Sequence, residues 1–76
     1  MTHHVLDARH LLCPLPVIRT QNAVARLAPG DTLEVHATDP GVLHDVPAWC
    51  RVHGHEVLSA RNEAGEVRVT LRVQGS

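Results

Sequence analysis

The chain has 76 residues and a net charge of −1, which suffices for one small domain and provides no basic surface for nucleic acid. It has one tryptophan and no phenylalanine or tyrosine, so the side chains that stack on bases are scarce as well. No apolar run approaches the roughly 20 residues that span a bilayer, and no signal peptide is visible. We therefore expect a single domain over residues 1–76 with neither nucleic acid nor a membrane as a partner.

The cysteine content favours a reducing compartment. Cys13 and Cys50 are the only two cysteines, and they form no C-x-x-C motif. A secreted domain of this size usually carries more cysteines, in pairs. We therefore expect a cytoplasmic protein with free thiols.

The first predicted elements are a strand over residues 5–7 and a helix over residues 14–27. The helix begins in Cys13-Pro14-Leu15-Pro16, because proline has the φ of the first helical position and lacks an N–H that would be unpaired there. Pro29-Gly30 ends it. The residues predicted to share its buried face are Val17, Ile18, Val24 and Ala28. The residues predicted to share its solvent face are Arg19, Asn22 and Arg26.

A second strand and a second helix follow. Residues 32–38 alternate between apolar and polar side chains, which is typical of a strand with one covered face. Asp39-Pro40 then has the pattern of a helix start, but Pro47 interrupts the apolar stripe. Either one helix kinks at Pro47, or a single turn precedes a second helix. We favour a helix over residues 45–53 that is capped by Asp45.

The remaining sequence predicts a strand over residues 56–61, a turn over residues 62–65 and a strand over residues 67–73. A helix between two strands indicates a right-handed parallel crossover, and the closing hairpin adds an antiparallel pair. Because the strands alternate, one face of the sheet meets water and both helices cover the other. The predicted fold is an α/β (α+β) two-layer sandwich, βαβαββ, with a four-stranded mixed sheet and two helices on one face.

Cys13 is the candidate reactive residue. Its predicted position at or beside the N-cap of the first helix exposes the sulfur to free backbone N–H groups and to the positive end of the helix dipole. Both favour the thiolate, so we expect a lowered pKa without a catalytic base. Pro14 and Pro16 stiffen the turn that presents the sulfur. No His/Asp relay is recognisable in the sequence.

Several motifs keep one register from Asp7 to about Leu71. They are Leu-Asp-Ala ahead of the Cys13 motif, Pro29-Gly30-Asp31, Thr38-Asp39-Pro40-Gly41 and Asp45-Val-Pro-Ala-Trp-Cys50. With this combination, the chain resembles the TusA/SirA family of sulfur carriers. The resemblance implies the βαβαββ fold given above.

The resemblance also implies a function. Cys13 would receive a sulfane sulfur as a persulfide from a cysteine desulfurase or a rhodanese-like donor. It would pass that sulfur to an acceptor protein in tRNA thiolation, cofactor synthesis or sulfur oxidation. The sulfur would be held as a covalent persulfide on Cys13, so we expect neither a cofactor nor a metal. We expect a monomer that acts as a sulfurtransferase together with its partner proteins.

The chain departs from the family pattern around the motif. Many members have glycine three residues before the cysteine and a basic residue directly before it, where this chain has His10 and Leu12. Gln21 and Asn22 stand where further basic residues often occur. These departures affect which partner is recognised. The residues predicted to contact a partner are His10, Leu12, Leu15, Arg19 and Arg26.

Other interpretations of the same residues remain open. We interpret Cys50, on the inward stripe of the second helix, as structural, although a Cys13–Cys50 bond would make the protein a thiol redox sensor. A non-catalytic interaction or regulatory module would have the same fold. The histidines do not match a standard zinc spacing. We interpret Asp39 and Asp45 as helix caps and Trp49 as a core residue.

Overall fold

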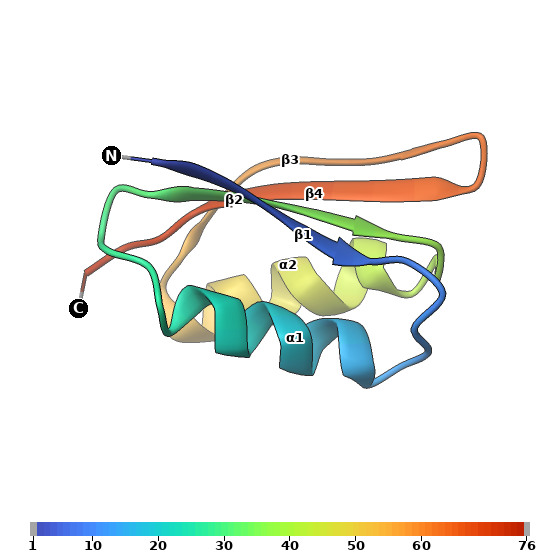
Figure 1. Ribbon diagram of the computed structural model, residues 1–76, viewed down its shortest axis with the longest axis horizontal. Helices are drawn as coiled ribbons and strands as arrows, with labels where there is room; N and C mark the ends of the chain where they lie inside the picture. The colour runs from blue at the N-terminus through green and yellow to red at the C-terminus, as the bar shows by residue number, and fades with distance from the viewer. Residues whose placement is uncertain (1, 76) are drawn as a thin grey trace.

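The computed structural model describes residues 2–75. Its six elements follow the predicted order βαβαββ. They are β1 (His3–Ala8), α1 (Leu15–Val24), β2 (Thr32–Ala37), α2 (Val42–His53), β3 (Glu56–Glu63) and β4 (Glu66–Arg72). Figure 1 shows both helices on the same side of the sheet, which confirms the predicted two-layer sandwich.

The sheet has the strand order β1-β2-β4-β3. β1 and β2 are parallel, and β4 pairs antiparallel with both β2 and β3. Because β1 and β2 are parallel, the β1–α1 and β2–α2 connections leave the sheet at the same edge, as Figure 1 shows. This edge brings together two segments that lie far apart in the sequence.

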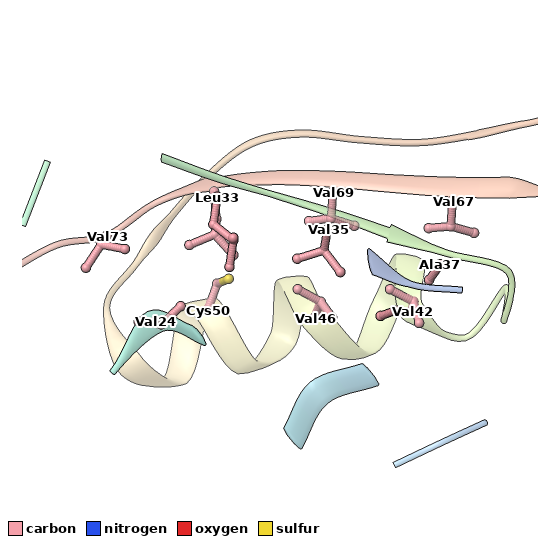
Figure 2. Close-up of a cluster of buried hydrophobic side chains, with 12 residues drawn as sticks. Val24, Leu33, Val35, Ala37, Val42, Val46, Cys50, Val67, Val69 and Val73 are labelled. Carbon is pink, nitrogen blue, oxygen red and sulfur yellow. The ribbon is translucent and has the colours of Figure 1, made fainter. Parts of the chain in front are cut away.

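The core lies between the sheet and the helices. Alternate residues of β2 and β4 face inward, in register: Leu33 pairs with Leu71, Val35 with Val69 and Ala37 with Val67. Each of these six side chains is at most 1% exposed. The helix residues that complete this core are Val24 from α1 and Val42, Val46 and Cys50 from α2 (Figure 2).

The first helix is shorter than predicted. α1 ends at Val24 because the chain tightens into i→i−3 bonds, with the N–H of Arg26 and of Leu27 donating to Ala23 and Val24. Its buried residues are Pro16, Thr20 and Val24. Ile18 is 44% exposed, and Ala28 is exposed beyond the end of α1, so their predicted places on the buried face are wrong. The Thr20 hydroxyl can be buried because it donates to the Pro16 carbonyl at 2.8 Å.

The second helix begins three residues earlier than predicted. A continuous series of bonds starts with the N–H of Val42 donating to the Asp39 carbonyl, and α2 then runs through Pro47 without a break. The prediction of a helix beginning at Asp45 is therefore wrong. Gly54, with φ of 78°, ends the helix in a left-handed conformation, as expected.

The closing hairpin has a tighter turn than predicted. β3 continues to Glu63, opposite Glu66, so that Ala64 and Gly65 alone form the connection. Both have positive φ, 53° and 82°, as a two-residue hairpin turn requires. β1 is also longer than residues 5–7, because His3 and His4 pair with Thr32 and Leu33.

Candidate functional site

Cys13 lies in the β1–α1 connection, two residues before the first residue of α1, and its side chain is exposed. Pro14 is the N-cap, and its carbonyl accepts the N–H of Ile18 at 3.2 Å. The N–H of Leu15 donates to the Leu12 carbonyl at 2.9 Å. The prediction that Cys13 lies at or beside the N-cap is thus confirmed.

Two carboxylates from the β2–α2 region form hydrogen bonds with Cys13. Asp39 accepts the backbone N–H of Cys13 through Oδ2 at 3.2 Å and that of Gly41 through Oδ1 at 3.0 Å. The Cys13 thiol donates to Asp45 Oδ2, with 3.7 Å between sulfur and oxygen. Asp39 therefore ties the two loops together, and Asp45 contacts the sulfur itself.

Gly41 lies beside both carboxylates. Its backbone is right-handed helical, with φ of −60° and ψ of −22°, so the conformation does not require glycine. A Cβ at this position would lie 3.3 Å from Asp39 Oδ1 and 3.5 Å from Asp45 Oδ2. The contact with Asp39 would be tight and that with Asp45 ordinary, so the missing side chain matters mainly for the position of Asp39.

The expected activation of Cys13 by the helix terminus is wrong. Desolvation of the sulfur, followed by the charge and hydrogen bond of Asp45 and the charge of Asp39, raises the pKa of Cys13 above its ordinary value. The amides that were expected to stabilise a thiolate are largely committed: Asp39 accepts that of Cys13, the Leu12 carbonyl accepts that of Leu15, and prolines 14 and 16 have none. The raised pKa favours the thiol over the thiolate at neutral pH.

Cys50 occupies the opposite kind of environment. It is 0% exposed and packs among the core side chains of Figure 2. Burial raises the pKa of its thiol to about 11. The prediction that Cys50 lies in the core is confirmed, and its sulfur is not accessible to a partner protein.

The other predicted site residues differ in how exposed their side chains are. Pro14 is exposed, whereas Pro16 is buried against the core. The five residues predicted to contact a partner are all exposed: His10, Leu12, Leu15, Arg19 and Arg26. Within residues 2–75, neither Arg19 nor Arg26 forms a salt bridge.

Three residues near the site were missed as functional candidates. Ile18 was assigned to the core and instead extends the exposed apolar surface of Leu12 and Leu15. Asp39 and Asp45 were interpreted as caps; Asp39 accepts the Gly41 N–H directly ahead of α2, but α2 itself has no side-chain cap bond. The signal that identifies the two acids is the predicted parallel crossover, since it places both strand ends at one edge.

The described residues contain no cluster of three metal-binding side chains and no pocket. Trp49 is half-buried against the core, and its ring lies 4.8 Å from that of His53 and 5.3 Å from that of His55. No helix among residues 2–75 has the length and apolar character needed to span a membrane.

A family model described as "Sulfurtransferase TusA" matches residues 4–73. The chain belongs to this family. The sulfur carrier protein TusA of Pseudomonas aeruginosa (strain LESB58) is 48% identical over 75 residues, with 95% of each chain covered. The sulfur carrier protein TusA of Pseudomonas putida (strain W619) is 46% identical over 68 residues, covering 90% of this chain and 85% of that protein. The sequence-based identification of the TusA/SirA family is confirmed.

The fold agrees with a solved structure of a SirA-like protein from Desulfitobacterium hafniense. The TM-score is 0.83, with 95% of this chain and 99% of that chain covered, at 23% identity. This similarity supports the architecture. Membership of the TusA family gives the protein the role of a sulfur carrier, and such a role requires a sulfur donor and a sulfur acceptor.

Proposed function

We propose that the protein carries a sulfane sulfur as a persulfide on Cys13. The observation that supports this most strongly is the contrast between the two cysteines, since Cys13 is exposed at the edge of the sheet and Cys50 is sealed in the core. A sulfur carrier exchanges its cargo inside complexes with other proteins. Only Cys13 is accessible for such an exchange.

The chemistry is thiol–persulfide exchange. The Cys13 thiol releases its proton to the solvent, and the resulting thiolate attacks the terminal sulfur of a donor persulfide; a bond forms between these two sulfur atoms, and the S–S bond in the donor breaks. The donor cysteine leaves as a thiolate with the bonding electrons, so the protein neither gains nor loses electrons overall. Delivery is the same reaction with the roles exchanged: an acceptor thiolate attacks the terminal sulfur on Cys13, the S–S bond on Cys13 breaks, and Cys13 leaves as a thiolate. We propose a cysteine desulfurase or a rhodanese-like protein as donor and a sulfur-relay or sulfur-oxidation protein as acceptor.

Mass spectrometry tests this assignment. After incubation with a cysteine desulfurase and cysteine, we expect the wild type and Cys50→Ala to gain the mass of one sulfur atom and Cys13→Ser to gain none. A Cys13→Ser protein that still loads sulfur would overturn the proposal. A wild type that binds its partner normally without gaining sulfur would instead favour a non-catalytic interaction module.

An exposed apolar surface next to Cys13 supports docking of a partner. Leu12, Leu15 and Ile18 are 75%, 45% and 44% exposed, and together they form what we call the apolar rim. Side chains of this kind contribute to binding when a partner excludes water from them. A partner that covers the apolar rim would also shield the terminal sulfur of the persulfide.

Replacing Ile18 with serine is expected to weaken donor binding by roughly fivefold, because the variant removes apolar area from the interface. Its effect on the free energy of unfolding should stay within about 0.5 kcal/mol, because Ile18 lies outside the core. Val52→Ser is the matched control, since Val52 is 80% exposed near the far end of α2. Calorimetric titration with the donor measures both affinities, and equal affinities for the two variants would argue against the apolar rim.

A further inference from the structure

We propose that Asp45 is a positioning residue that keeps the Cys13 sulfur protonated while the protein is free of its partners. This inference rests on the proposed function and specifies how the same site is regulated. The thiol is the poorer nucleophile of the two protonation states, so Asp45 limits reactions of Cys13 outside the donor complex.

The geometry separates this role from helix capping. Asp45 lies in the first turn of α2, where a carboxylate commonly accepts a backbone N–H, but α2 has no side-chain cap bond. Within residues 2–75, the Asp45 side chain makes a single hydrogen bond, and its partner is the Cys13 thiol at 3.7 Å. Its carboxylate is directed at the sulfur.

The charge of Asp45 is not neutralised by a neighbour. Neither Asp45 nor Asp39 forms a salt bridge in the described part of the chain. The charges that act on the Cys13 sulfur are those of these two acids, one from α2 and one from the β2–α2 connection. A thiolate at Cys13 would be repelled by both, whereas a thiol has a hydrogen-bond acceptor in Asp45.

The side chains of the two acids have different hydrogen-bond partners. Asp39 is held by the N–H groups of Cys13 and Gly41, so removing it would disturb the loop as well as the charge. Within residues 2–75, the one hydrogen bond of the Asp45 side chain goes to the sulfur, and Asp45 can be changed to asparagine with little change in shape. Asp45 is therefore the residue at which the electrostatic effect can be measured by itself.

The test measures the rate at which iodoacetamide alkylates Cys13 as a function of pH, in a Cys50→Ala background that leaves one thiol. We expect Asp45→Asn to raise the rate at neutral pH by roughly fivefold and to shift the profile toward lower pH, because the thiolate fraction increases. Asp45→Ala should shift the profile in the same direction. Alanine is a good helix former, so this variant keeps the first turn of α2. The matched control is Glu63→Gln, which removes an exposed carboxylate from the β3–β4 hairpin.

Profiles of Asp45→Asn and Asp45→Ala that coincide with that of Glu63→Gln, or that shift toward higher pH, would overturn the role of Asp45. Sulfur loading of the Cys50→Ala protein by a cysteine desulfurase is measured in parallel. Failure to load would contradict the proposed function, whereas unchanged alkylation profiles with normal loading would contradict only the role of Asp45. The two hypotheses therefore fail separately.

Discussion

Replacing Leu71 with alanine is expected to destabilise the protein by about 2–5 kcal/mol. Leu71 is 0% exposed on β4, and its neighbours in the sheet are Leu33 of β2 and Val57 of β3. The truncation removes apolar contacts in the middle of the sheet and leaves a cavity that flanking strands fill only partly. A domain of this length has a total stability of about 4–11 kcal/mol, so the loss is a large fraction of it.

Urea unfolding measures this effect, with the fluorescence of the single tryptophan, Trp49, as the probe. The matched control is Leu12→Ala, which removes the same atoms from a side chain that is 75% exposed. Its free energy of unfolding should stay within about 0.5 kcal/mol of the wild type. If both truncations shifted the urea midpoint equally, the core between sheet and helices would be described incorrectly.

Alkylation of Cys13 is expected to rise about tenfold for each pH unit between about pH 6 and about pH 8. Desolvation and the nearby charges of Asp45 and Asp39 raise the pKa of Cys13, so this range lies below its titration and the thiolate is the minor form throughout. Cys50 does not contribute, because it is buried and its pKa is raised to about 11. A rate that levels off below pH 7 would show a stable thiolate and contradict the effect of the two acids.

The same raised pKa has a consequence for stability. The folded state binds the thiol proton of Cys13 more tightly than the unfolded state does. This contribution is fully present below the pKa of the unfolded chain and is lost as the pH rises through the pKa of the folded protein. The folded state therefore weakens on the alkaline side, and replacing Cys13 with serine removes that part of the pH dependence.

The alternation of apolar and polar residues along the strands made the architecture predictable. In β2 and β4 every second residue is apolar, and the side chains that follow this pattern form the core with almost no exposure. Together with the two proline-rich helix starts, this pattern defined the element order and placed both helices on one face. The position of Cys13 next to the start of α1 followed from Pro14 and Pro16 alone.

Helix boundaries were less predictable, because they depend on contacts that a local pattern does not contain. Pro47 suggested an interruption, yet α2 continues through it and buries the proline against the core. Ile18 fits the apolar stripe of α1, but the buried face of this helix runs through Pro16, Thr20 and Val24, and the buried Thr20 hydroxyl donates to the Pro16 carbonyl. In each case tertiary packing decided between two locally acceptable arrangements.

The electrostatics of the site depended on a long-range contact. The predicted helix terminus alone favours a thiolate, and this interpretation omitted the two acids of the β2–α2 region. Asp39 and Asp45 are 26 and 32 residues away from Cys13 in the sequence and reach it because β1 and β2 are parallel. Desolvation of the sulfur, together with the charges of these two acids, raises the pKa of Cys13 where the helix terminus alone would lower it.

The most direct measurement is peptide mapping of the wild-type protein after loading with a cysteine desulfurase and cysteine, with the persulfide trapped by alkylation before digestion. Cleavage after arginine places Cys13 in residues 10–19 and Cys50 in residues 27–51. We predict that the additional sulfur is found only in the peptide of residues 10–19. Additional sulfur in the peptide of residues 27–51, with none on residues 10–19, would contradict the account.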